Sequence, residues 1–94
     1  MLFAVIAMLK PDAEGKLAEL NDAFNEHLAQ PFQRIRLAGR LCDPDRRLTG
    51  YLALVDAESA ERAEAWLKQS PIYKAQLYES VTVAEYSLEV GSLD

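Results

Sequence analysis

The sequence predicts an α+β domain, in which an antiparallel sheet is covered on one side by two helices. Four segments of strand length carry alternating or continuous apolar residues, and two segments with helical spacing lie between them. Prolines and short polar runs separate these segments, which is typical of turns. At 94 residues the chain has the length of one small domain, so we expect residues 1–94 to form a single unit.

The first segment, residues 2–9, is apolar at every position, which predicts a strand covered on both faces. Pro11 and Asp12 interrupt it. An amphipathic helix is then predicted by apolar residues at helical spacing, namely Leu17, Leu20, Phe24 and Leu28. Pro31 is expected to end this helix near residue 29 or 30, because proline disfavours the helical conformation of the residue before it.

The middle of the chain predicts a hairpin. Residues 35–42 alternate between apolar and more polar positions, which indicates a strand with one face toward a core. Residues 43–46 have the composition of a turn, and residues 49–55 resume as a strand that is apolar on both sides.

A second helix and a last strand complete the pattern. Asp56 and Ser59 can each cap this helix, and Pro71 closes it. Its buried side is predicted to consist of Ala60, Ala63, Trp66 and Leu67. A short turn containing Ile72 leads to a strand over residues 77–88. Residues two positions apart in a strand share a face. We therefore expect Val81 and Val83 on one face of this strand, and Tyr78, Thr82 and Tyr86 on the other.

The resulting order, βαββαβ, is the ferredoxin-like arrangement, with the first and third strands in the middle and both helices on one face. The two doubly apolar strands are the ones that this arrangement places centrally. Two helices cover only one side of the sheet. We assign four residues to the uncovered side: Tyr51, Val55, Tyr78 and Tyr86. A second copy of the chain is the expected cover, which predicts a homodimer through the open sheet face and a cleft at the seam.

Charge and cysteine content exclude several classes. Ten basic and fifteen acidic residues give a net charge of −5, which disfavours nucleic acid as a partner. The apolar start is too short for a membrane span and lacks the marks of a targeting signal. A single cysteine, Cys42, forms neither a disulfide nor a redox pair within the chain, which fits a reducing cytoplasm. One histidine and one cysteine do not suggest a metal site, and we expect no cofactor.

Several short motifs, taken in order, resemble the YCII-related domain family. These are 27–29 (HLA), 35–39 (IRLAG), 43–45 (DPD), 50–52 (GYL), 63–67 (AEAWL), 70–71 (SP), 74–75 (KA) and 78–81 (YESV). Members of that family are small dimeric α/β-barrel proteins related in fold to muconolactone isomerase. The resemblance implies an active site that pairs the helix histidine, here His27, with the acidic residue just before the proline of an acid-proline-aromatic motif. Here Ser70 stands in place of the acid, Ile72 in place of the aromatic residue, and Arg40 in place of a proline.

His27 and Ser70 are the candidate catalytic residues. His27 is the only histidine, and an imidazole that titrates near neutral pH suits a proton carrier. The alternative is a half-buried histidine satisfied by a backbone carbonyl. Ser70 can orient the ring or a water by a hydrogen bond but supplies no carboxylate. The alternative is that Ser70 only terminates a helix.

Arg36, Arg40 and Tyr78 are the candidate ligand-binding residues. The two arginines lie four positions apart in a strand, which predicts that they share a face pointing away from the helices. Two guanidinium groups there can bind a carboxylate or phosphate, or they can be solvated edge residues or pair with acids across the dimer. Tyr78, with Tyr51 and Tyr86, either lines an aromatic pocket or packs at the interface.

These residues predict a cleft that binds a small anionic organic molecule, and the resemblance implies acid/base chemistry on it, such as isomerisation, elimination or hydrolysis. His27 is then the proton carrier, and Arg36 or Arg40 anchors the anion. The alternative is a catalytically silent dimer that binds a metabolite or a protein partner. The serine at position 70 favours this alternative, because it removes the acid of the family's catalytic pair.

Overall fold

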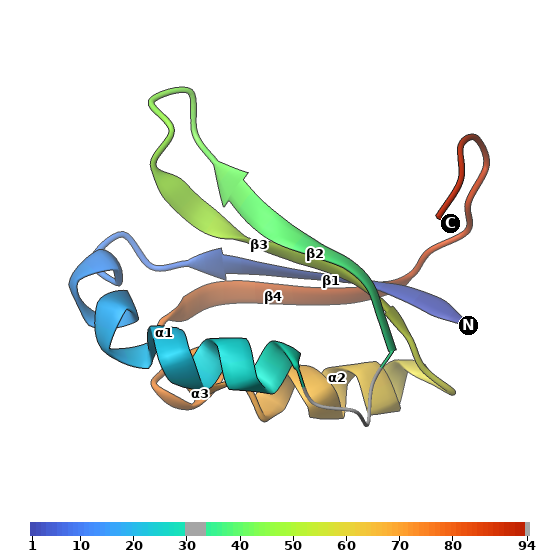
Figure 1. Ribbon diagram of the computed structural model, residues 1–94, viewed down its shortest axis with the longest axis horizontal. Helices are drawn as coiled ribbons and strands as arrows, with labels where there is room; N and C mark the ends of the chain where they lie inside the picture. The colour runs from blue at the N-terminus through green and yellow to red at the C-terminus, as the bar shows by residue number, and fades with distance from the viewer. Residues whose placement is uncertain (30–33, 94) are drawn as a thin grey trace.

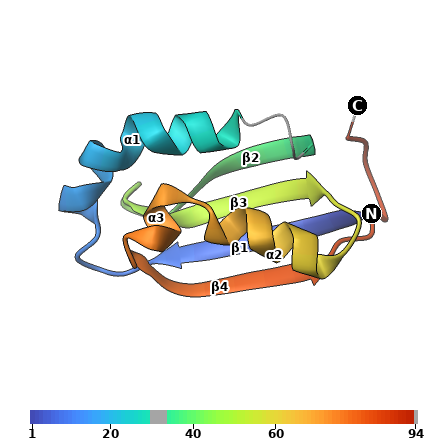
Figure 2. The ribbon, with the colours of Figure 1, turned by 90° about the horizontal axis from the view of Figure 1, so that it is seen from below.

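A computed structural model describes residues 1–29 and 34–93. It contains four strands and three helices, β1 (Leu2–Leu9), α1 (Glu14–Leu28), β2 (Arg34–Cys42), β3 (Leu48–Asp56), α2 (Ala60–Lys68), α3 (Pro71–Lys74) and β4 (Tyr78–Glu85). The strands form one antiparallel sheet in the order β2-β3-β1-β4. All three helices lie on one side of it (Figures 1 and 2). The predicted α+β class and the central position of β1 and β3 are therefore confirmed.

The element ends follow local signals in the sequence. The strand predicted over residues 2–9 has those bounds. Ser59, and not Asp56, caps α2, because its hydroxyl accepts a hydrogen bond of 3.2 Å from the amide of Arg62. Helix α1 ends at Leu28, and the predicted role of Pro31 falls outside the described residues.

The short helix α3 replaces the turn that we predicted before β4, so the order is βαββααβ. Pro71 takes the first position of this helix, where its missing amide hydrogen costs nothing and its fixed φ angle is favourable. Pro71 therefore begins α3, whereas we predicted from the sequence only that it closes the second helix. Strand β4 is shorter than predicted, from Tyr78 to Glu85 and not over residues 77–88.

The faces of the sheet differ from the prediction. Antiparallel partners share a face, and Val55 pairs with Phe3 and Tyr51 with Ala7. Ala7 and Val55 belong to the same buried cluster as Trp66 and Leu67, so Val55 and Tyr51 lie on the helix side. Their predicted place on the uncovered side is wrong. Because β1 and β3 are apolar on both faces, their period-two pattern did not indicate which face the helices cover.

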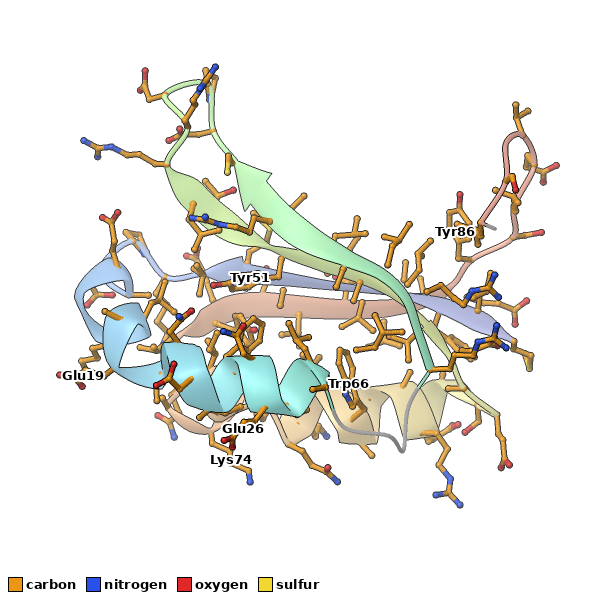
Figure 3. All side chains as sticks on the ribbon, viewed as in Figure 1. Glu19, Glu26, Tyr51, Trp66, Lys74 and Tyr86 are labelled. Carbon is orange, nitrogen blue, oxygen red and sulfur yellow. The ribbon has the colours of Figure 1, made fainter. Side chains whose placement is uncertain are left out.

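A β-bulge explains the error for Tyr78. The register between β1 and β4 shifts at Met8/Leu9, so Tyr78 pairs with Leu9 although Ser80 pairs with Met8. Tyr78 therefore packs on the helix side together with Val83. A bulge adds a residue to one strand and reverses the alternation of faces. Tyr86 does lie on the side away from the helices, opposite to Trp66 (Figure 3).

The core lies between α2, α3 and the middle strands. One cluster of buried residues contains Val5, Ala7, Ala53, Val55, Trp66 and Leu67, and a second contains Leu9, Ala13, Ile72 and Leu77. The other side of the sheet, which we call the open face, includes Ile6, Met8, Leu37, Leu52 and Leu54. Ile6, Met8 and Leu52 are only half-buried there, and Leu37 is 42% exposed. The first strand is thus fully covered on its helix side alone.

Among the described residues, no helix is long and apolar enough to cross a membrane.

Candidate functional site

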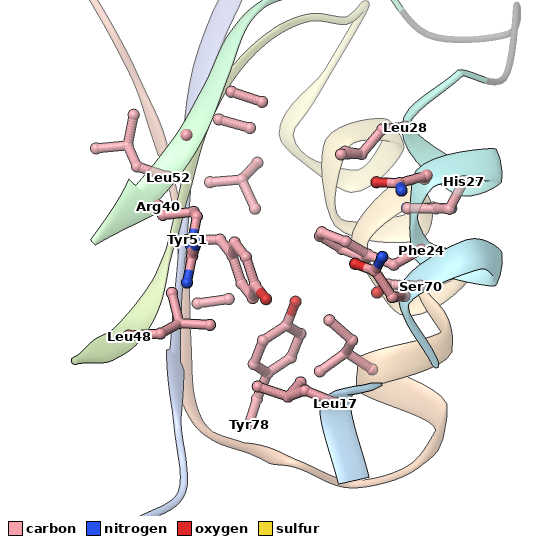
Figure 4. A pocket seen from close by; sticks show the side chains of 18 of the residues that line it. Leu17, Phe24, His27, Leu28, Arg40, Leu48, Tyr51, Leu52, Ser70 and Tyr78 are labelled. Carbon is pink, nitrogen blue, oxygen red and sulfur yellow. The ribbon is translucent and has the colours of Figure 1, made fainter. Parts of the chain in front are cut away.

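A cavity of about 740 Å³ lies between helix α1 and the sheet. Figure 4 shows side chains from α1, the strands and the α2–α3 junction around it. The apolar side of α1, formed by Leu17, Leu20, Phe24 and Leu28, is therefore only half-buried. Helix α1 has its main packing against α3, whereas α2 packs on β1 and β4. The space that α1 leaves over the sheet is the candidate site.

His27 is the buried residue of α1, with 8% of its surface exposed. Its ring stacks on the Trp66 ring, with 4.9 Å between centroids and 18° between planes. Burial lowers the pKa of His27, and the positive charge of Lys74 lowers it further. The imidazole is therefore neutral at neutral pH, and one of its nitrogens has a free lone pair.

The Nε2 atom of His27 is fully covered, and no group in the described part of the chain hydrogen-bonds to it. The backbone-carbonyl interpretation of His27 therefore does not hold for this nitrogen. A buried polar atom without a partner costs about 1–3 kcal/mol. Trp66 Nε1 and Ser70 Oγ share this condition, and all three residues line the cavity.

Ser70 lies at the junction of α2 and α3, with 1% of its surface exposed. Its backbone amide donates to the Leu67 carbonyl at 3.0 Å, but its side chain makes no capping hydrogen bond. Its hydroxyl lies close enough to the Tyr78 hydroxyl to favour ionisation of the phenol, yet the two groups miss the geometry of a hydrogen bond. Helix termination alone does not account for a buried side-chain hydroxyl at this position.

Two tyrosines, Tyr51 from β3 and Tyr78 from β4, extend into the cavity (Figure 4). Burial raises the pKa of Tyr78 to about 12, more than the Ser70 hydroxyl lowers it. Burial also raises the pKa of Tyr51, and the nearby charge of Arg40 opposes this in part. Both phenols are therefore protonated at neutral pH and can donate hydrogen bonds.

The position of Tyr51 depends on its neighbour Gly50. A Cβ atom at Gly50 would collide with the carbonyl oxygen of Ala7 on the adjacent strand. Glycine therefore allows β3 to approach β1 closely at this point. Tyr51 then pairs with Ala7, whose small side chain leaves room above the sheet.

Arg40 and Arg36 are separated by the fold. Arg40 pairs with Tyr51 on the helix side and lines the cavity. Arg36 does not line it; its guanidinium donates to the Leu93 carbonyl at 3.0 Å and lies 3.7 Å from the Asp56 carboxylate. The prediction that they share a face is wrong, because a bulge in β2 beside Ile35 reverses the alternation.

The charged residues around the cavity are mostly positive, whereas the net charge of the whole chain is negative. Three arginines and one glutamate line it, namely Arg40, Arg46, Arg47 and Glu14. The chain as a whole carries a net charge of −5. The cavity is therefore a locally basic site on an acidic protein. No three His, Cys, Asp or Glu side chains gather into a metal-binding group within residues 1–29 and 34–93.

The sequence did not indicate three of these residues as parts of a site. Trp66 was predicted only as a core residue, and the sequence carries no sign that His27 would be its partner. Arg46 and Arg47 were interpreted as a turn or left unassigned, since only the folded hairpin brings them to the cavity. The signal that was available is the pair of adjacent arginines in an acidic chain.

The fold and the cavity define the class: an α+β domain with a ligand-sized space, open to solvent, beside a buried histidine. The chain belongs to the YCII-related domain family, whose family model matches residues 1–87. This confirms the resemblance found in the sequence motifs.

A solved structure with a similar fold is 5-chloro-2-hydroxyhydroquinone dehydrochlorinase from Burkholderia phenoliruptrix AC1100, in complex with 2,5-dihydroxybenzoquinone. The TM-score is 0.79 and the identity 21%, and the match covers 93% of this chain and 94% of that chain. At this identity the likeness concerns the fold alone. A search of curated proteins gives no match.

Proposed function

We propose that the cavity binds a small anionic organic molecule and that His27 carries a proton in its isomerisation, elimination or hydrolysis. One observation carries this proposal. His27, Ser70, Tyr78 and Arg40 come from four different parts of the chain and line one cavity. The proposal agrees with the family, and it fits the dehydrochlorination for which the structurally similar enzyme is named.

The size and charge of the cavity support a small anion as the ligand. Pockets for small molecules measure about 300–1,000 Å³, and this one measures about 740 Å³. Its basic lining attracts anions, and Arg40 offers a guanidinium that can hold a carboxylate with two hydrogen bonds. Arg36 is engaged with Asp56 and Leu93, so Arg40 is the arginine that we propose as anchor.

His27 suits the role of base because it is neutral. Its lowered pKa leaves the imidazole free to accept a proton at neutral pH. Nε2 is covered, so the ring must turn or Trp66 must shift for this nitrogen to meet a ligand. A partner for Nε2 offsets the cost of its unpaired state, which favours such a rearrangement when a ligand binds. Ser70 then orients the ring or the ligand and does not act as the acid.

We also propose that the protein works as a homodimer through the open face, as a dimeric α/β barrel, in the cytoplasm. The half-exposed apolar residues of the open face support a second copy as the cover. Leu37→Asp places a charge on this face and should shift the sedimentation coefficient toward that of a monomer. Val90→Asp is the control, because Val90 is 90% exposed and lies outside the sheet. A wild type that sediments as a monomer at micromolar concentration refutes the dimer.

The catalytic proposal is tested by substitution of His27. A panel of small lactones and halogenated or hydroxylated carboxylates is screened for product by mass spectrometry. His27→Ala and His27→Gln should lower turnover of any active compound by roughly 10²–10⁴-fold, the contribution of a positioned acid or base. Tyr86→Phe, which alters a residue outside the cavity, should leave turnover unchanged. Full turnover in folded His27 variants, checked by circular dichroism, removes His27 from catalysis.

A second candidate function is binding without turnover. It is favoured by two features of His27: the charge that lowers its pKa is that of a cation, Lys74, and its Nε2 atom is covered. A carboxylate usually fixes a catalytic histidine. Under this alternative, the same compounds raise the melting temperature of the wild type, and no product forms. Steady product formation that depends on His27 eliminates it.

A further inference from the structure

Tyr51 and Tyr78 stand on either side of β1 and bring two phenolic hydroxyl groups together in the cavity. Tyr51 pairs with Ala7 on one side of that strand, and Tyr78 pairs with Leu9 on the other. The bulge in the β1–β4 pairing brings Tyr78 to the helix side, where it faces the same space as Tyr51. Figure 4 shows the two hydroxyls pointing toward one another. Their mutual electrostatic effect is consistent with this proximity.

Packing holds both rings in place. The Phe24 ring lies 4.9 Å from the Tyr51 ring at an interplanar angle of 44°. Tyr78 packs against both clusters of buried residues. Rings fixed in this way present their hydroxyls at defined positions, so little conformational entropy is lost when they bind a ligand atom.

Two nearby groups offset part of the cost of placing negative charge between the buried hydroxyls. Arg40 is near enough to Tyr51 to favour the ionised form of the phenol, so it also favours an anion beside it. Ser70 acts on Tyr78 in the same direction. Burial outweighs both effects on the phenols and keeps them protonated, so they meet a ligand as hydrogen-bond donors.

We propose that Tyr51 and Tyr78 form a two-donor site for a delocalised oxyanion, the phenolate or enolate oxygen of a planar ligand. This inference rests on the proposed function, because it specifies what the same cavity binds. The apolar neighbours of the pair, including Phe24 and Ala53, suit a flat carbon skeleton. Two neutral donors aimed at one oxygen stabilise the charge that develops there in a transition state.

The site explains how a base such as His27 can act on a weakly acidic C–H bond. When the imidazole removes a proton next to a carbonyl group, the C–H electron pair forms a C=C bond and the carbonyl π pair moves onto oxygen. The two hydroxyls donate hydrogen bonds to that oxygen. Return of the electrons expels an anionic leaving group from the carbon next to the deprotonated one in an elimination. In an isomerisation, a second C=C bond conjugated with the enolate carries the electron pair to a more distant carbon, which takes the proton back.

The test compares two probes with the same nitrophenyl ring, 4-nitrophenolate and its neutral methyl ether 4-nitroanisole, at a pH where the phenolate is ionised. Quenching of Trp66 reports binding, since it is the only tryptophan and lines the cavity. We expect the wild type to bind the anion more tightly than the ether. Tyr51→Phe and Tyr78→Phe should each weaken binding of the anion about tenfold, the value of one hydrogen bond to a charged group. Neither variant should change binding of the ether.

Tyr86→Phe is the matched control and should bind both probes as the wild type does, because Tyr86 lies outside the cavity. Melting curves verify that each Phe variant is folded. The inference is overturned if the wild type does not prefer the anion, if it binds neither probe, or if the Phe variants bind the anion unchanged. An anion preference that disappears in Arg40→Gln but survives in both Phe variants also overturns it. These binding constants are measured independently of turnover in His27→Ala. Failure of the oxyanion site therefore does not refute the catalytic role of His27, and failure of that catalytic role does not refute the oxyanion site.

Discussion

The two sides of the helical layer differ in how closely they pack on the sheet. Helix α2 buries Ala63, Trp66 and Leu67 against the sheet, whereas the buried residue of the longer α1 is His27. Beneath α2 and α3 the sheet carries a packed core, and beneath α1 it carries a cavity. We call these the core side and the cavity side. One helix layer thus both stabilises the sheet and leaves space for a ligand.

The boundary between the two sides holds the unpaired polar atoms. His27 comes from the cavity side, Trp66 comes from the core side, and Ser70 lies at the junction of α2 and α3. A stable core pairs nearly all of its buried polar groups. Three unpaired groups in contact with one cavity therefore indicate a region that is arranged for a ligand and not for maximal stability. The difference between the sides can be measured.

The largest expected effect is a truncation on the core side. Ile72 of α3 is 1% exposed, so Ile72→Ala leaves a void and should lower the free energy of unfolding by roughly 2–5 kcal/mol. Leu20 of α1 contacts the same cluster but is half-buried, and Leu20→Ala should cost only about 1 kcal/mol. Urea denaturation monitored by circular dichroism gives both values. Equal losses in the two variants would mean that α1 is packed as firmly as α3.

A smaller effect separates two serines that precede helices. Ser59 caps α2 with its hydroxyl, so Ser59→Ala should lower the free energy of unfolding by about 1 kcal/mol. Ser70 precedes α3 without a capping bond, and Ser70→Ala removes an unpaired buried oxygen, so we expect it to leave stability unchanged or raised. The same denaturation experiment compares them. A loss in Ser70→Ala as large as that in Ser59→Ala would show that the Ser70 hydroxyl has a stabilising partner.

The architecture was largely predictable from the sequence, because it depends on local periodicity. The continuous apolar run of β1, the turn before β3 and the spacing of α2 each identify an element without knowledge of the others. The assignment of faces was not predictable where it depends on bulges. One extra residue beside Ile35 or Tyr78 reverses the faces of the residues on one side of the bulge relative to those on the other, and no residue type marks these bulges.

Parts of the candidate site were predictable for a different reason. His27, Arg40 and Tyr78 were selected by the chemistry of their side chains, and Ser70 by its place in a family motif, so their selection does not depend on which face each was assigned to. All four line the cavity. The stacking of His27 on Trp66 and the meeting of Tyr51 with Tyr78 join distant parts of the chain. Such contacts require the three-dimensional packing of α1 over the sheet, which periodicity does not specify.

The smallest expected effect concerns the pH dependence of stability. It arises on the cavity side, where His27 titrates. The pKa of His27 is lowered in the folded state, so the unfolded chain takes up a proton first as the pH falls below about 6.5. The stability associated with neutral His27 is therefore complete above that pH and is lost as the pH falls through the lowered pKa. His27→Phe retains an aromatic ring against Trp66 but does not titrate. Urea denaturation between pH 7 and pH 5 should show a shallower loss of stability in this variant than in the wild type, whereas Tyr86→Phe should follow the wild type. Parallel curves for His27→Phe and the wild type would mean that His27 titrates in the folded protein as it does in the unfolded chain, and that the cavity side does not hold it neutral.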